Sequence, residues 1–264
     1  RDVVVRASAN RGIGVEGGAA AEIAGVTVTG TTTAAGAGIW VGEQSRATVR
    51  EASVEAGQGH GLYVGRGGAL DLAASRVRSN AGGAITVEPG ASLAGLTEVE
   101  LAGNAQDGVR HRGREIATNE TWRSFGYPYY LVDLGIAVRG PNGPVLTIEP
   151  GVVVKAGDGT AISIGDGGAG QLRAIGTAEE PIVFTTVSAP TPGRWGGLLF
   201  GPDTGGSRVE HAVVEGGGAF SRAGILVRGG APVLRDVVGR ASANRGSPLD
   251  ADPAVELADA AVTG

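Results

Sequence analysis

The stretch from residue 38 to residue 108 repeats one short phrase three times: GIWVG (38–42), GLYVG (61–65) and AITVE (84–88). Each phrase is followed by turn residues, a second short apolar alternation, a third one, and a corner of small residues. One apolar position of the phrase recurs at intervals of 23, 23 and 24 residues, at Ile39, Leu62, Ile85 and Val109. A fixed period of this length is typical of a solenoid, in which each repeat is one coil stacked on the next.

The apolar runs within each period have the length and pattern of strands. They are three to five residues long and alternate apolar with small or polar residues, which is too brief for helices. Glycine, at 49 of 264 residues, stands at nearly every junction and allows sharp turns. Three short strands per coil, each stacked on a strand of the next coil, predict an all-β parallel β-helix, that is, a single-stranded β-solenoid. Parallel crossovers favour the right hand, so we expect a right-handed β-helix.

The repeated position can be followed along the whole chain at intervals of 22 to 36 residues. This spacing predicts about ten to eleven coils in a single β-helix domain that spans residues 1–264. Residues two apart on a strand point to the same side, so a column of Ile, Val and Leu is expected inside. The longest interval contains VSAPTPGRW (187–195), which we expect to project as a loop. The successive positions are Ile13, Ile39, Leu62, Ile85, Val109, Ile136, Ile162, Leu198, Ile225 and Ser247.

Composition excludes several kinds of site. The chain has no Cys and no Met, so it can form neither a disulfide nor a thiolate metal site. The net charge of −5 is scattered along the sequence, which argues against a nucleic-acid partner. No apolar run approaches the roughly 18 residues that a membrane-spanning helix needs. We therefore expect no cofactor, no metal, no nucleic-acid partner and no membrane span in this segment.

One set of outward-facing side chains is a candidate ligand site. These residues lie between the inward positions of the first strand on four successive coils, so they are expected about 4.8 Å apart. Two rings and a guanidinium in a row could hold an extended glycan, or they could simply cover the sheet. The four residues are Trp40, Tyr63, Thr86 and Arg110.

Residues 110–133 form the least regular coil and hold five of the eleven aromatic residues. Two interpretations stay open for this aromatic cluster. The rings could cover the side of the solenoid at a thickened corner, or they could be a platform for the flat faces of sugars. The five residues are Trp122, Phe125, Tyr127, Tyr129 and Tyr130.

Asn recurs at the corner that precedes a first strand. Corner amides can hydrogen-bond to one another and to the backbone of the turn, so we expect a structural role, with ligand binding as the alternative. The residues concerned are Asn10, Asn80, Asn104 and Asn244.

Catalysis on polysaccharides requires acidic residues gathered on one sheet, as a Ca²⁺ site or as an acid/base pair. Here the carboxylates are scattered, and Glu100 follows Thr27, Ser53 and Arg76 along the third strands. The three His residues share no spacing suited to one metal. They are His60, His111 and His211. With neither an acidic cluster nor a set of metal ligands, the sequence predicts no catalytic residue and favours a protein that is not an enzyme.

Residues 121–218 resemble a known family. The runs that carry the resemblance are TWRSFGYPYYL (121–131), LTIEPGVVVKAGDG (146–159), QLRAIGTAEEPIVFTT (171–186) and GRWGGLLFGPDTGGSRVEHAVVEGGG (193–218). They are similar to the right-handed parallel β-helix repeat proteins of bacterial surfaces and bacterial secretions, which share the pectate-lyase-like fold. The resemblance implies an extracellular or cell-surface location in bacteria. It implies little about activity, because enzymes, phage tailspikes and adhesins share this fold.

The two ends of the chain are similar to each other. Residues 235–264 align without gaps to residues 1–30, with 17 of 30 positions identical. We therefore expect the chain to be one 234-residue period of a longer tandem array plus a 30-residue overlap. Neither end shows an obvious cap, so we expect the end strands to be covered by end-to-end stacking with a second copy or by flanking coils of the same chain.

These observations support two hypotheses about function. The first is a non-enzymatic structural β-solenoid, secreted or displayed at the cell surface, that acts as a stalk, an adhesin shaft or a head-to-tail filament subunit. The alternative is a β-helix protein that binds or cleaves carbohydrate, with extracellular polysaccharide as its partner.

Overall fold

The computed structural model describes residues 3–133, 135–221, 223–242, 256–258 and 261–262. All regular elements within these residues are β-strands, and every pair of strands in register is parallel. The described part of the chain has no helix that could cross a membrane. Asn244 and Ser247 lie outside the described residues. The chain forms two compact units, residues Arg1–His111 and Arg112–Gly264.

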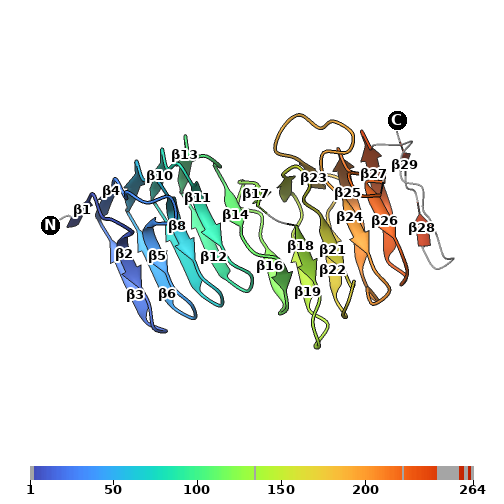
Figure 1. Ribbon diagram of the computed structural model, residues 1–264, viewed down its shortest axis with the longest axis horizontal. Coiled ribbons are helices and arrows are strands. Elements are labelled where there is room, and N and C mark those ends of the chain that lie inside the picture. The colour runs from blue at the N-terminus through green and yellow to red at the C-terminus, as the bar shows by residue number, and fades with distance from the viewer. Residues whose placement is uncertain (1–2, 134, 222, 243–255, 259–260, 263–264) are drawn as a thin grey trace. The chain divides into compact units, whose positions relative to one another are not determined.

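Unit 1, residues 1–111, is a stack of coils with three strands each (Figure 1). Its first sheet contains β2 (Arg11–Val15), β5 (Ala37–Val41), β8 (His60–Val64), β11 (Gly83–Val87) and β14 (Val109–His111). The second contains β3 (Ala20–Ala24), β6 (Arg46–Arg50), β9 (Ala69–Ala73) and β12 (Ser92–Thr97). The third contains β1 (Val3–Arg6), β4 (Val26–Thr29), β7 (Ser53–Glu55), β10 (Arg76–Arg78) and β13 (Glu100–Ala102).

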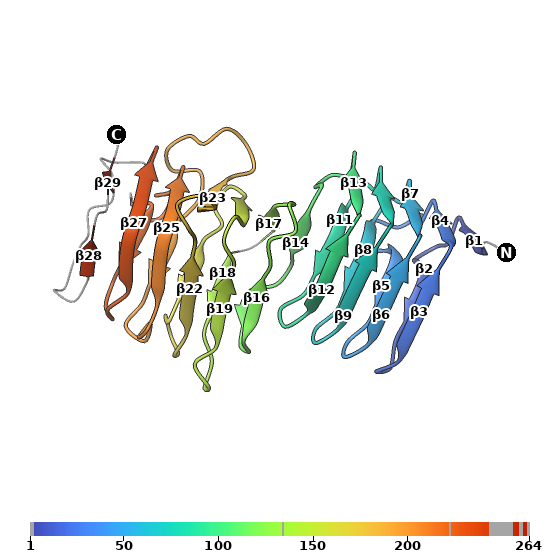
Figure 2. The same cartoon turned by 180° about the vertical axis from the view of Figure 1, so that it is seen from behind.

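Unit 2, residues 112–264, repeats the three-strand coil, as the view from behind in Figure 2 shows. One sheet contains β15 (Glu115–Ile116), β18 (Ile136–Val138), β21 (Ile162–Ile164), β24 (Leu198–Phe200) and β26 (Ile225–Val227). The other strands are β16 (Glu120–Trp122), β17 (Tyr129–Leu131), β19 (Val145–Ile148), β20 (Val153–Ala156), β22 (Gln171–Ile175) and β23 (Ile182–Thr186). β25 (Arg208–Glu215) and β27 (Val233–Arg240) each extend from the second strand position into the third, and β28 (Glu256–Ala258) and β29 (Ala261–Val262) pair with β27.

The stacking register of unit 1 confirms the predicted column. Ile39 lies opposite Ile13 and Leu62, and Leu62 lies opposite Ile85, which in turn lies opposite Val109. Ile39, Leu62 and Ile85 are fully buried. The chain is therefore a parallel β-solenoid, as predicted, with about nine coils. The predicted ten to eleven coils is an overestimate.

One step of the predicted column is wrong. Ile136 was expected to follow Val109, but the strand that precedes β18 in its sheet is β15, with Glu115 opposite Ala137. The interval of 27 residues between Val109 and Ile136 has the length of one coil, although it also contains a corner and the additional short strand β15. Beyond this point the prediction is confirmed, since Ile162 lies between Ile136 and Leu198.

Glycine in the first strands is required by the narrow interior. A Cβ atom on Gly38 would lie 2.2 Å from Cγ1 of Val54, and one on Gly61 would lie 2.3 Å from Cγ1 of Val77. These distances are far below a van der Waals contact, so a valine of the third sheet occupies the space that a side chain would need. Beside each of these glycines, the interior of the coil therefore has room for only the one valine side chain.

A second recurrent feature is the corner between the second and third strands of unit 1. Gly25, Glu51, Ala74 and Glu98 all have positive φ there, between 46° and 60°. The amide of each of the first three donates to a carbonyl of the next coil, for example Glu51 N to Ala73 O at 3.3 Å. The hydrogen bonds between coils thus continue through the bend and offset the strain of a left-handed backbone at residues other than glycine.

The segment between β23 and β24 leaves the stack as the predicted projecting loop (Figure 1). Its last residues return to the core, since Trp195 is fully buried and its Nε1 donates to Glu215 O at 2.7 Å. The loop is therefore anchored at its C-terminal end.

Candidate functional site

The four outward residues selected from the sequence do lie side by side. Trp40 on β5 is opposite Tyr63 on β8, Tyr63 is opposite Thr86 on β11, and Thr86 is opposite Arg110 on β14. We call this row the ladder. The residues that the repeat spacing predicts to be neighbours are therefore neighbours on the first sheet of unit 1. The geometry of their side chains indicates what the row can do.

The ring faces in the ladder are occupied by one another. Trp40 and Tyr63 are stacked with their centroids 4.0 Å apart and their planes 8° apart. The guanidinium carbon of Arg11, on the preceding strand, lies 4.1 Å from the centroid of the Trp40 ring. Trp40 therefore lies between a cation and a second ring. A sugar that stacks on an aromatic face needs a free face, so this arrangement favours the interpretation that the rings cover the sheet.

Arg11 takes part in the ladder because of Gly14, which is the residue opposite Trp40 on β2. Gly14 has no side chain, and a Cβ atom placed there would lie 3.9 Å from Cδ of Arg11. The Arg11 side chain thus fills the space beside Gly14 and ends over the indole. Sequence reasoning missed Arg11, although the absence of a side chain at Gly14 was a signal that a neighbouring residue covers Trp40.

The remaining polar groups of the ladder are bonded to neighbouring coils. The Tyr63 hydroxyl donates to the Glu88 carboxylate, whose second oxygen accepts from Arg66 N at 3.2 Å. Thr86 Oγ1 lies 2.9 Å from Nδ1 of His60, and Arg110 donates to Gly82 O at 3.3 Å. Thr86 and His60 are buried. Each of these bonds joins one coil to the next.

A groove of about 680 Å³ opens beside the ladder, at the corner that leads to the second sheet. Glu16 and Glu88 lie at its two ends, while Gly42 and Gly65 occupy the corresponding place on the two coils between them. The two glycines leave this part of the corner without side chains. The groove is further lined by Arg11, Trp40, Glu43, Gln44 and Tyr63. It offers hydrogen-bonding groups and the edges of two rings.

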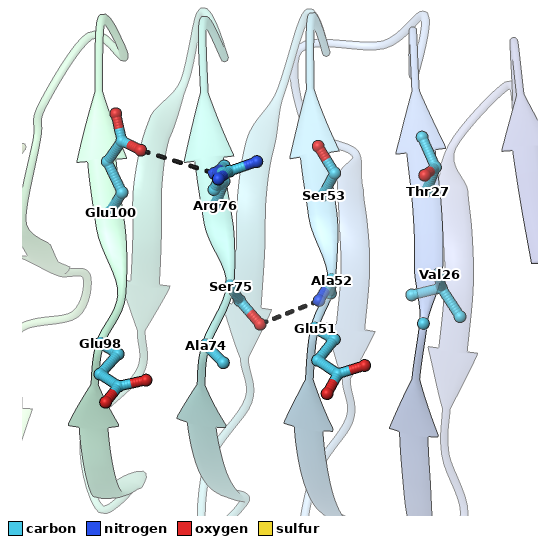
Figure 3. Close-up of a pocket in the computed structure, with 11 residues that line it drawn as sticks. Val26, Thr27, Glu51, Ala52, Ser53, Ala74, Ser75, Arg76, Glu98 and Glu100 are labelled. Carbon is cyan, nitrogen blue, oxygen red and sulfur yellow. Dashed lines mark hydrogen bonds and ion pairs between the residues drawn. The ribbon is translucent and has the colours of Figure 1, made fainter. Parts of the chain in front are cut away.

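A second hollow, of about 590 Å³, lies over the third sheet of unit 1 and is drawn in Figure 3. The column predicted from the sequence forms its floor, with Thr27 opposite Ser53, Ser53 opposite Arg76, and Arg76 opposite Glu100. Arg76 Nε lies 3.7 Å from the Glu100 carboxylate, and Arg78 also contacts that carboxylate. The charge of Glu100 is thus shared between two guanidinium groups.

Glu51 and Glu98 border this hollow at the positive-φ corner, with Ala74 between them (Figure 3). Both carboxylates are exposed. They are two coils apart, which places their backbones about 10 Å apart. Sequence reasoning missed this pair because only strand positions were compared, although residues 25, 51, 74 and 98 recur with the period of the coil. Among the described residues, no three of His, Asp and Glu are grouped to hold a metal ion.

The aromatic cluster of unit 2 packs largely into the molecule. Trp122, Tyr129 and Tyr130 are buried, whereas Phe125 and Tyr127 are half-buried. Trp122 and Tyr129 are stacked with centroids 5.0 Å apart, and Trp122 Nε1 donates to Glu120 at 2.8 Å. Burial raises the pKa of Tyr129, whose hydroxyl donates to Arg123 O and accepts from Arg123 N. This geometry supports the covering role more than a sugar platform.

The corner Asn residues form bonds between coils at two of the predicted positions. Asn80 Nδ2 donates to Asn104 Oδ1 at 2.9 Å, and Asn80 Oδ1 accepts from Gly57 N at 3.1 Å. Asn10 lies elsewhere on the corner, where its Oδ1 accepts from Thr33 Oγ1 at 3.3 Å. Asn10 stands two residues further along the corner than Asn80, so it does not continue the same row.

The His residues also contact their neighbours. His111 on β14 is buried opposite Val87. His211 has positive φ at the bend of β25, and its Nε2 lies 3.5 Å from the Asp236 carboxylate on β27. Three different environments are thus found for His60, His111 and His211, all within the stack.

The coils and their column of aliphatic residues define a parallel β-helix repeat protein. A family model of the pectate-lyase-like β-helix domain matches residues 129–231. This match agrees with the resemblance found in the sequence and is consistent with the right hand of that family. Neither a search of curated proteins nor a search of solved structures found a match to this chain.

Proposed function

We propose that the chain is a structural β-solenoid, secreted or displayed at a bacterial surface, that works as a stalk, an adhesin shaft or a filament subunit. The proposal rests on the contacts that the polar side chains on the outside of the coils make. Most ion pairs on the outside of the coils join residues of adjacent coils, 21 to 36 residues apart in the sequence. Examples are Arg50 with Asp71 at 2.9 Å, Arg139 with Glu115 at 2.9 Å and Arg194 with Asp158 at 2.7 Å.

Contacts of this kind resist separation of the coils. Each exposed ion pair contributes little alone, about 0 to 1 kcal/mol. Within each unit these ion pairs add to the backbone hydrogen bonds between strands of successive coils and to a buried aliphatic column. Stability in such a stack is a sum of neighbour interactions, and separating any two coils breaks all of those that join them.

Single-molecule force spectroscopy tests this role. With handles at both ends of the chain, we expect unfolding in discrete steps of about 80 Å, the length of one extended coil of 23 residues at about 3.5 Å per residue. Smooth extension at low force, as for a chain without packed coils, would contradict the proposal. Release of reducing ends from acidic polysaccharides by the purified protein would also contradict it, because it would identify an enzyme.

The groove beside the ladder favours a second candidate function, carbohydrate binding. Its carboxylates and amide can hydrogen-bond to sugar hydroxyls, while the ring edges supply an apolar wall. Glycan-array binding would be compared for the wild type and for the variants Trp40→Ala, Tyr63→Ala and Glu43→Gln. Glu43 is exposed and lies outside the ring stack, so its variant changes the groove without disturbing the ladder. Equal binding by all four proteins, or binding by none, would exclude this site.

A further inference from the structure

The repeated sequence at the two ends of the chain has a repeated backbone. Residues 3–6 (VVVR) form β1, and the residues 234 positions later, 237–240 (VVGR), form the second half of β27. In β27 the alternate residues Val237 and Gly239 are buried, and in β1 the alternate residues Val3 and Val5 lie opposite the buried Val26 and Val28. Each strand is followed by an alanine with a φ of 50°, Ala7 and Ala241. The similarity found in the sequence therefore extends to the position of the segment within a coil.

The two copies of this strand differ in whether the strand of a preceding coil lies beside them. The second half of β27 pairs with β25, with Ala212 opposite Val237 and Glu215 opposite Arg240. Val237 is only 4% exposed there, whereas its counterpart Val3 on β1 is 55% exposed. The next residue of β1, Val4, is 49% exposed. An apolar edge of this kind on a β-strand is suited to pairing with another strand.

We infer that the outer edge of β1 pairs with the β25 strand of a preceding copy of the same 234-residue unit, in the register that β27 shows on β25. Val3 then takes the place of Val237 opposite Ala212, and Val5 takes the place of Gly239 opposite Val214. Arg6 takes the place of Arg240, whose Nη1 lies 3.7 Å from the Glu215 carboxylate. The joint between two copies would thus have the hydrogen bonds and the ion pair that the chain already contains.

The preceding copy must be joined in tandem. In each chain the edge of β25 is already covered by its own β27, so a separate molecule has no free β25 edge to offer. In a tandem chain the residues from Arg1 of the second copy follow residue 234 of the first copy, in place of the residues from Arg235 onward. β1 then has the same position within the coil as the second half of β27. This inference rests on the proposed structural role, because it describes how such a solenoid is lengthened.

Hydrogen exchange in a two-unit chain tests the joint. The chain would carry residues 1–234 directly in front of the full chain, and a matched control would carry residues 1–225 there, which places β1 at the wrong point of the coil. We expect peptides that cover β1 to show two equal populations in the two-unit chain, one exchanging at least tenfold more slowly, and a single fast population in the control. A single fast population in both chains, or the same protection in both, would overturn the inference.

A substitution in the existing chain gives an independent measurement. If residues 239 and 5 are equivalent, Gly239→Val restores the valine of the first copy opposite Val214, and the melting temperature should rise by several degrees. Gly61→Val is the control, because a side chain at Gly61 meets Val77 and should lower the melting temperature. A lower melting temperature for Gly239→Val would refute the equivalence. Hydrogen exchange reports on the joint and the melting temperature on the equivalence of the two strands, whereas the force measurement reports on the structural role, so the two ideas can fail separately.

Discussion

The ladder either covers the first sheet or binds a glycan, and the substitution Trp40→Ala distinguishes these two roles. Removing the indole abolishes the stack with Tyr63 at 4.0 Å and the contact with the Arg11 guanidinium at 4.1 Å. The ring pair is worth about 0.5 to 1.5 kcal/mol and the cation–π contact about 0.5 to 1 kcal/mol. Trp40 is half-buried, and the apolar area that it covers adds about 2 kcal/mol. We expect a total loss of about 3 to 4.5 kcal/mol in the free energy of unfolding.

Urea unfolding followed by far-ultraviolet circular dichroism measures this loss, because the signal of the strands does not depend on the indole that is removed. Trp40→Phe is the matched control, since a smaller ring can keep the stack, and we expect it to lose less stability than Trp40→Ala. A loss below 1 kcal/mol for Trp40→Ala would refute the view that the ring covers the sheet. If glycan binding disappeared while stability was kept, the ladder would instead be a binding site.

Three further predictions follow from buried contacts. Gly61→Ala should lower the free energy of unfolding by about 1 to 3 kcal/mol, because its Cβ atom would overlap Val77, and the added substitution Val77→Ala should recover part of the loss in thermal melts. Asn80→Ala should cost about 2 to 3 kcal/mol in chemical unfolding, since it leaves Gly57 N without its acceptor inside the corner; an unchanged midpoint would contradict the structural role. Burial raises the pKa of Tyr129, so in the folded protein its phenol should stay neutral at a pH where the phenol of an unfolded chain ionises. The free energy of unfolding should therefore fall as the pH rises above about 10, the pKa of an unfolded tyrosine. Absorbance titrations of phenol ionisation and unfolding titrations of Tyr129→Phe should lack this contribution.

The arrangement of unit 1 was predictable because its coils are nearly equal in length. Intervals of 23, 23 and 24 residues leave one way to stack Ile39, Leu62, Ile85 and Val109, and the observed register is that one. Interval length alone predicts the wrong neighbour for Ile136, because β15 and not β14 lies beside β18. An interval does not tell whether the chain between two positions makes one coil or a corner with an extra strand such as β15.

In the candidate site, too, some features follow from the sequence and others only from the structure. That Trp40, Tyr63, Thr86 and Arg110 are neighbours follows from the period alone. That the two rings lie parallel, with Arg11 over one of them, depends on side-chain rotamers and on the empty space at Gly14. The carboxylates of Glu51 and Glu98 share a hollow because the backbone bends with positive φ at both, which strand patterns do not reveal.

The sequence by itself determined the coil, its three strands and the aliphatic column, because a period of about 23 residues and alternation along each strand leave a thin coil that must bury its apolar side against its neighbours. It also determined that the ends of the chain repeat each other. Only the tertiary structure decided what the outward side chains do, because their contacts lie between coils and depend on which neighbour offers space or a charge. The same reason explains why Val3 is exposed and Val237 is buried: the two valines have the same place in the coil, and only one of them has β25 beside it.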